Sequence, residues 1–391
     1  MKEKFIKDFE IPNKRIETWK FTDLQKICEK NNFKPITKDK KKIKKINISK
    51  NLFFNPKNNF IFLENGYVEK INKNSNDIEI ISLESNGKEI ENKKDFTRSD
   101  SLVDINNTFL NQSLIIKIKK NKKIKNPISI FYCNSENNYV INNRIKIVLE
   151  ENSEAEINEF FFSNNKSLYW NNVHNFISLN KKSKLNHNKI QIESENALHT
   201  SSSYVKCDDS SQYKKFIYSV GGIMSRIEVM SSINAKNVDF NIKGLYLAKK
   251  KRHHDITTLM QHKHPESKSN QHIKGILEKE STGVFQGKVI VAKDAQKTDA
   301  FQFNQNLLLA ESAEVNAKPE LEIYADDVKC SHGATTGELD EEMLFYLRSR
   351  GLNKEEAKKL LIEGFINELF DDIENKELKK KLLLTSKKII Y

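Results

Sequence analysis

The clearest candidates for chemistry in this sequence are a cysteine and a histidine two residues apart, Cys330 and His332, in the run ADDVKCSHGATTGELDEE at 325–342. Residues two apart in an extended strand lie on the same face, so the thiol and the imidazole would be neighbours. Such a pair can form a nucleophile with a lowered thiol pKa, or supply two ligands to a metal site. A cysteine hydrolase also needs an oxyanion hole and an orienting Asn or Asp, which the sequence does not identify. The local pattern alone therefore favours a glycine-containing turn over a catalytic dyad.

A second group of possible ligands lies close together in the sequence and consists of His253, His254, Asp255, His262, His264 and His272. The spacing of His262 and His264 would place both rings on one face of a strand, a geometry that can bind metal. A zinc or iron site needs three or four converging ligands with partners of their own. Stacked polar side chains that satisfy one another are therefore the favoured interpretation, and a metal site is the alternative.

The four cysteines, at positions 28, 133, 207 and 330, are far apart and form no C-x-x-C pair. The spacing therefore predicts neither a self-contained zinc finger nor a ferredoxin-type cluster site. We also expect no disulfide framework in a chain of this length without secretory features. A chemically active cysteine would have to recruit partners from elsewhere in the fold or from another chain.

The formal net charge of +13 raises the question of nucleic-acid binding. Lysine-rich runs at 38–50, 117–125 and 248–254 are scattered and mixed with Asn and Ile, whereas nucleic-acid binders cluster their charge and add stacking aromatics. We therefore expect no nucleic-acid partner. No stretch approaches the roughly 20 apolar residues of a membrane span, and the first residues lack the apolar region of a secretory signal. A cytoplasmic location is expected.

The elements that must position these residues change character along the chain. Near the start, Thr22 with Gln25 is typical of a capping box and predicts a short helix through Leu24 and Cys28. The run NFIFLENGYVEKI at 59–71 predicts a hairpin around its Asn-Gly turn. From about 106 to 335, short alternating runs separated by Asn, Ser, Gly and Asp predict many strands, in a barrel, a sandwich or a β-helix. A parallel β-helix suits this length best, because each coil needs only its neighbours.

The last part of the chain predicts two helices. Asp340 is a suitable N-cap for the first helix, and Gly351 stands where a C-terminal cap belongs. Asn353 and Glu356 form a capping-box pattern for the second. The second helix is expected to carry an apolar stripe on one face, made of Ala357, Leu360, Leu361, Gly364, Phe365 and Leu369. That face either packs on the β body or docks a partner.

Taken together, several motifs resemble the SufD family of iron–sulfur cluster assembly proteins. The long run from VAKDAQKTDAFQF to LRSRGL at 291–352 carries most of the resemblance, and ETWKFTDL, HHDITT, SKSNQHIKGIL and GVFQGKVIV support it. The specific motifs extend from about 250 to 370. The length and the sequence CSHGATTG resemble SufD more than SufB, whose chains are usually longer and carry an acidic variant at this turn.

The resemblance implies a mainly β fold with three domains. A right-handed parallel β-helix core at 106–335 would lie between a mixed, partly helical N-terminal domain at 1–105 and an α-helical C-terminal domain at 336–391. SufD-like proteins pair with SufB, and each subunit docks a SufC-type ABC ATPase through its terminal helices. Here the candidate docking or packing face is Met343, Leu344, Leu347, Leu361 and Phe365.

The resemblance also implies a role for Cys330 and His332. His332 matches a histidine at the SufB–SufD interface and is a candidate ligand of iron or a nascent cluster, with Cys330 beside it. The chain would be a non-catalytic scaffold subunit that holds iron or a cluster only transiently, within the complex, and that in isolation can form a homodimer. The alternatives are a β-helix enzyme acting on polysaccharide and a metal-dependent hydrolase that uses the histidine group.

Overall fold

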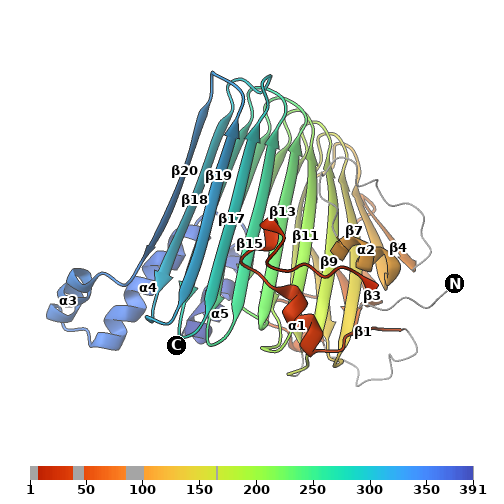
Figure 1. Cartoon of the computed structure of the whole chain (residues 1–391). Helices are drawn as coiled ribbons and strands as arrows, with labels where there is room; N and C mark the ends of the chain where they lie inside the picture. The colour runs from red at the N-terminus through yellow and green to blue at the C-terminus, as the bar shows by residue number, and fades with distance from the viewer. Residues whose placement is uncertain (1–7, 38–47, 85–100, 164–165, 391) are drawn as a thin grey trace.

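The computed structural model describes residues 8–37, 48–84, 101–163 and 166–390, and its body is a stack of coils made from two parallel sheets (Figure 1). The chain alternates between the sheets, so that successive strands of one coil belong to different sheets. The first sheet contains, from its free edge, β19 (Glu314–Ile323), β17 (Thr282–Val291), β15 (His253–His262), β13 (Met224–Ile233), β11 (Leu198–Cys207), β9 (Tyr169–Leu179), β7 (Tyr139–Leu149), β5 (Gln112–Ile118) and β4 (Ile78–Glu84), with β1 (Lys34–Pro35) paired to β7. The second contains β20 (Lys329–Gly337), β18 (Asp299–Leu308), β16 (Lys268–Leu277), β14 (Asp239–Ala248), β12 (Gln212–Ser219), β10 (Lys184–Ile192), β8 (Glu154–Ser163), β6 (Ile128–Asn134), β2 (Asn59–Glu64) and β3 (Tyr67–Asn72).

The chain turns at the corners of the coils, where polar residues separate one strand from the next. At one corner of the coils, a residue with a positive φ recurs about every 30 residues, at Asn121, Asn152, Lys182, Ser210, Asn237, Glu266 and Lys297. Several of these residues donate their backbone N–H to the next coil, as from Asn152 to Lys181 at 2.9 Å. The left-handed conformation suits Asn but is tolerated by other residues when neighbouring coils hold it in place. The coils therefore repeat in structure, although no single residue type recurs at the corner position.

The space between the two sheets forms the main core. Its aliphatic and aromatic side chains come from every coil and are almost fully buried. Buried polar groups also lie there, for example around Glu159, which accepts hydrogen bonds from His187 at 2.7 Å and Asn175 at 2.8 Å and pairs with Lys189 at 3.3 Å. Burial alone would raise the pKa of Glu159, but Lys189 and His187 lower it overall. A buried charge is tolerated here because its partners are buried with it.

The N-terminal helices cover the outer face of the first sheet (Figure 1). They are η2 (Glu17–Trp19), α1 (Leu24–Lys30) and α2 (Ser101–Thr108), and η4 (Ile48–Lys50) packs on the other sheet. Asp23, not Thr22, caps α1, and its side chain accepts from the N–H of Lys26 at 3.0 Å. The predicted Thr22 cap is therefore wrong, although the short helix after it is confirmed.

Thr22 instead joins a buried contact between the N-terminal segment and the solenoid. Its hydroxyl donates to Asp255 at 2.5 Å. Asp255 also pairs with Arg226, whose guanidinium donates to the carbonyl of Thr18 at 2.8 Å and lies 4.0 Å from the centre of a Trp19 ring. We call residues 17–22 the N-terminal strap. Two of the motifs that carry the family resemblance, ETWKFTDL and HHDITT, thus contact each other.

Of the three C-terminal helices, α4 (Lys354–Phe370) and α5 (Lys376–Ile390) pack on the outer face of the second sheet, and α3 (Glu341–Ser349) contacts chiefly α4. The predicted caps at Asp340, Gly351 and Asn353 are confirmed, but α5 was not expected. The predicted stripe of α4 is only partly right, since its buried residues are Ala357, Ile362, Ile366, Leu369 and Phe370, while Leu360 is 49% exposed. Apolar residues occur on most sides of this helix, so their spacing does not single out one face.

The predicted mainly β fold, a parallel β-helix with helices at its ends, is confirmed. The Asn-Gly hairpin is also confirmed: Asn65 and Gly66 have φ values of 48° and 86°, and β2 pairs antiparallel with β3. Because β2 and β4 pair with β6 and β5, the N-terminal strands continue the two sheets. The domain boundaries at 105 and 335 stay predictions, and most of the lysine-rich run at 38–50 lies outside the described residues. Among the described helices, none is long and apolar enough to cross a membrane.

We expect the free energy of unfolding to fall as the pH is lowered below about 6.5. Burial lowers the pKa of His187 and His262 to about 4 and that of His254 to about 3. The unfolded chain therefore binds protons that the folded chain does not, and stability that is present above pH 6.5 is lost as the pH falls towards these values. Each histidine contributes up to about 1.4 kcal/mol per pH unit. Urea unfolding across this range measures the slope.

A matched pair of variants tests the cause of this slope. His254→Gln is expected to make it shallower, whereas His264→Gln leaves it unchanged because His264 is exposed in the turn after β15. Equal slopes for His254→Gln and the parent chain would contradict the explanation.

Candidate functional site

The run that contains Cys330 and His332 forms β20, the last strand of the second sheet. β20 pairs with β18 alone, with Cys330 opposite Ala300 and His332 opposite Gln302. Its other edge carries no strand among the described residues. The candidate pair therefore lies on a free edge, where backbone groups are available to another chain.

Cys330 and His332 lie on the inner face of β20, as the spacing predicts. Cys330 is half-buried and packs against the main core, whereas His332 is exposed because no further coil covers it. Burial raises the pKa of the Cys330 thiol, with a smaller opposing effect of a backbone hydrogen bond from Ala300. A thiol with a raised pKa is a poor nucleophile, so the structure does not support a catalytic dyad.

The free edges of β19 and β20 together form what we call the open end of the solenoid, at the upper left of Figure 1. Inner positions that are buried in the preceding coil are exposed or half-exposed here: Phe285 and Val289 are buried, but their β19 neighbours Ala317 and Leu321 are not. Ile323 is 39% exposed and Tyr324 is 64% exposed. The open end is thus an apolar surface around the exposed imidazole of His332.

Two glutamines lie beneath His332 inside the stack. Gln302 is the register partner of His332 on β18, and Gln271 is the partner of Gln302 on β16, and both are fully buried. The Gln271 carbonyl accepts from the Thr258 hydroxyl at 2.5 Å, but its amide nitrogen and both amide atoms of Gln302 have no hydrogen-bond partner among the described residues. We call Gln271 and Gln302 the amide column. Both residues lie in runs that carry the family resemblance, but their contacts could not be predicted from the sequence, because only the register of the coils places them in one column.

The histidine group does not converge on one point. His253 and His254 lie on opposite faces of β15, His262 ends that strand, and His272 lies in β16. His264 follows β15 in an exposed turn, so the prediction that His262 and His264 share a strand face is wrong. His254 contacts Ser219 at 2.8 Å, and His262 contacts Ser269 at 2.8 Å. Within the described ranges no three metal-binding side chains lie together, so the structure does not support the metal-hydrolase alternative.

The candidate docking residues occupy different environments. Met343 is 45% exposed, Leu344 is buried, and Leu347, Leu361 and Phe365 are half-buried. Two larger exposed side chains on α3 were not predicted: Phe345 is 72% and Tyr346 is 51% exposed, while Leu360 of the predicted stripe is 49% exposed on α4. In Figure 1, α3 projects from the body beside the lower end of β20. The exposed apolar surface of α3 and α4 therefore consists mainly of Met343, Phe345, Tyr346 and Leu360.

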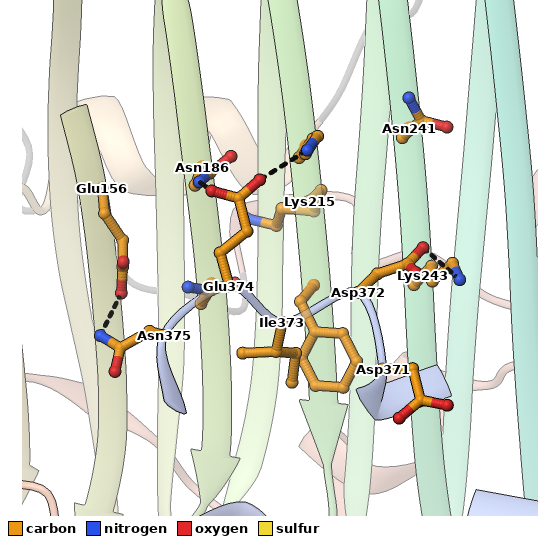
Figure 2. Close-up of a pocket in the computed structure, with 13 residues that line it drawn as sticks. Glu156, Asn186, Lys215, Asn241, Lys243, Asp371, Asp372, Ile373, Glu374 and Asn375 are labelled. Carbon is orange, nitrogen blue, oxygen red and sulfur yellow. Dashed lines mark hydrogen bonds and ion pairs between the residues drawn. The ribbon is translucent and has the colours of Figure 1, made fainter. Parts of the chain in front are cut away.

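The loop between α4 and α5 fixes these helices to the solenoid. It borders a cavity of about 330 Å³ on the outer face of the second sheet (Figure 2). Glu374 pairs with Lys214 at 2.6 Å and accepts from Asn186 at 3.1 Å, and Asp372 pairs with Lys243. Ile373 between them is buried. These contacts give α4 and α5 a fixed position, whereas α3 contacts chiefly α4.

Comparison with known proteins identifies relatives that match more than half of the chain. A family model described as "SUF system FeS cluster assembly, SufBD core domain" matches residues 131–365. An iron–sulfur cluster assembly SufBD family protein of Synechocystis is 31% identical over 288 residues, which cover 71% of this chain and 64% of that protein. The iron–sulfur cluster assembly protein SufD of Escherichia coli is 34% identical over 235 residues, 60% of this chain and 56% of that protein.

A plant protein gives a similar result. The chloroplastic protein ABCI7 of Arabidopsis thaliana is 31% identical over 293 residues, 73% of this chain and 62% of that protein. The chain therefore spans less than two thirds of the length of each of these relatives. The matched region includes β20, Cys330, His332 and most of α4.

We expect Cys330 to be the first of the four cysteines to react with iodoacetamide in the folded chain, but more slowly than an exposed thiol. Cys133 and Cys207 are buried, and burial raises the pKa of Cys28 and Cys207 to about 12. Only the thiolate reacts, so these residues should be labelled only when the chain unfolds. Mass spectrometry of timed samples measures the order, with Cys330→Ser as the control. Labelling of Cys207 before Cys330 would contradict the structure.

Proposed function

Because the chain belongs to the SufBD family of the SUF iron–sulfur cluster assembly system, we propose that it is a scaffold subunit that completes a cluster-building site together with a SufB-type partner. The observation that carries this proposal is the position of Cys330 and His332 on the free strand of the open end. A subunit interface there would cover both residues and the apolar surface around them.

The donor atoms at the open end suit this role. A thiolate and an imidazole are ligands that iron and iron–sulfur clusters accept, but a cluster needs about four ligands. With Cys330 and His332 as the candidate donors, the remaining ligands would come from the partner chain. In this proposal the cluster is a product that is assembled at the interface and then transferred, and it is not a resident cofactor of the chain. A homodimer formed through the same end is the expected state of the chain without its partner.

The exposed surface of α3 and α4 supports a second part of the proposal, the docking of a SufC-type ABC ATPase. Aromatic residues such as Phe345 and Tyr346 often dominate the free energy of binding at protein interfaces. Only residues 338–340 separate β20 from α3. Motion of a docked ATPase would therefore act directly on the strand that carries His332. In this proposal ATP hydrolysis belongs to the partner, and this chain has no catalytic activity of its own.

The proposed setting is the cytoplasm. All four cysteines are free, which suits a reducing compartment.

We expect His332→Ala to lower the iron and sulfide bound by the complex by about tenfold or more, because it removes a ligand. The free energy of unfolding should stay within about 0.5 kcal/mol of the parent value, since His332 is exposed. The chain is co-expressed with SufB- and SufC-type partners, and iron and acid-labile sulfide are measured in the purified complex. Thr336→Ala, on the same face of β20, is the matched control. Unchanged iron and sulfide in the His332 variant would overturn the ligand role.

We expect the double change of Phe345 and Tyr346 to Ala to weaken ATPase binding by about 2 kcal/mol or more, the size of a typical hot spot. Tyr324→Ala removes an equally exposed aromatic ring from the open end and should weaken pairing with the SufB-type partner instead. Calorimetric titration with each purified partner measures both effects. If the two variants affect the two partners equally, the surfaces are not separate and the assignment fails.

A further inference from the structure

Gln302 carries a buried, unpaired amide on the strand next to β20, at the register position of His332. Successive strands of a sheet lie about 4.8 Å apart, and the side chains of register partners share a face. Gln302 and His332 are such partners, so the amide and the imidazole belong to adjacent levels of the same inner face. The amide is fully buried, whereas the ring above it is exposed.

The packing around Gln302 makes room for its amide. A Cβ atom at Gly287, on the facing sheet, would lie 2.6 Å from the Gln302 amide nitrogen and 2.7 Å from the ring of Phe285. A side chain at this position would therefore force the Gln302 amide or the Phe285 ring to shift. Thr258, the register partner of Gly287, already donates its hydroxyl to Gln271.

An unpaired buried amide lowers the stability of the fold. Leaving a buried donor or acceptor without a hydrogen bond is unfavourable, and an apolar side chain of similar size avoids that loss. Gln191, one of the other buried glutamines, shows the usual arrangement: its carbonyl accepts from the N–H of Gly221 at 3.0 Å and its amide donates to Glu193 at 3.1 Å. Gln302 lacks such partners in the described part of the chain, and it lies at the one place where another chain is expected to close the stack.

We propose that Gln302 is a positioning residue for His332. When a partner covers the open end, the Gln302 carbonyl accepts a hydrogen bond from one ring N–H of His332, and the other ring nitrogen is left unprotonated to face the interface. Histidines that bind metals usually donate their second nitrogen to such an acceptor, which fixes the tautomer and the orientation of the ring. This inference rests on the proposed ligand role of His332 and gives a role to Gln302, a residue of the run at 291–352 to which no function was assigned from the sequence.

The experiment uses the full chain in complex with its SufB- and SufC-type partners, and Co²⁺ as the probe. Visible absorption of bound Co²⁺ reports affinity and ligand geometry without any cluster-building activity. Gln302→Leu is expected to weaken Co²⁺ binding about tenfold and to change the shape of the spectrum. Gln302→Glu keeps an acceptor oxygen and is expected to restore the affinity to within about threefold of the parent complex.

Thermal unfolding separates positioning from a structural role. Gln302→Leu is expected to leave the Tm unchanged or to raise it, because it removes an unpaired amide. The control Gln191→Leu should lower the Tm and leave Co²⁺ binding unchanged, since its hydrogen bonds lie far from the open end. A lower Tm for Gln302→Leu with normal Co²⁺ binding would overturn the proposal and assign the residue to packing.

His332→Ala distinguishes this inference from the function on which it rests. If His332→Ala abolishes the Co²⁺ signal and Gln302→Leu leaves it intact, only the positioning role fails. If His332→Ala also has no effect, the ligand role itself fails.

Discussion

The structure depends on one constraint, the in-register stacking of parallel strands. Each coil satisfies its backbone hydrogen bonds and covers its inner side chains only through the coils on either side of it. At the N-terminal end, β4 and the β2–β3 hairpin close the sheets with antiparallel pairs. At the C-terminal end, β19 and β20 have no such cover in the described chain. The two ends of the stack are therefore not equivalent, and the chemically interesting residues lie at the uncovered one.

The same constraint explains why so many polar side chains lie inside. Coils of nearly constant size bring residues of successive strands into columns, so that one buried polar group can be satisfied by another in the same column or across the interior. Glu159 with His187 and Lys189 is a complete cluster of this kind. Gln271 and Gln302 form an incomplete one. The incomplete column ends at His332, where the stack itself ends.

Local patterns in the sequence predicted the local structure well. The Asn65–Gly66 turn and the caps at Asp340 and Asn353 were predictable because each depends on two or three neighbouring residues. The same-face position of Cys330 and His332 followed from strand geometry. The period of the coils could not be recognised in the sequence, because the corner position is occupied by Asn, Lys, Ser or Glu in different coils. Thr22 was assigned to a cap because its real partner, Asp255, is more than two hundred residues away. Gln302 was missed because only the fold places it beneath His332.

The N-terminal strap links the beginning of the chain to its last coils. Glu17 pairs with Lys318 of β19 at 2.5 Å, and Gln286 of β17 donates to the carbonyl of Thr18 at 3.2 Å. The strap leaves the ribosome first, but its partners are made hundreds of residues later. It remains without them until the coils of Arg226, Asp255 and Lys318 have been synthesised and stacked. The strap can therefore complete its contacts only after the coils up to β19 have formed, and its bonds to Gln286 and Lys318 then tie the last strands of the first sheet to the N-terminal segment.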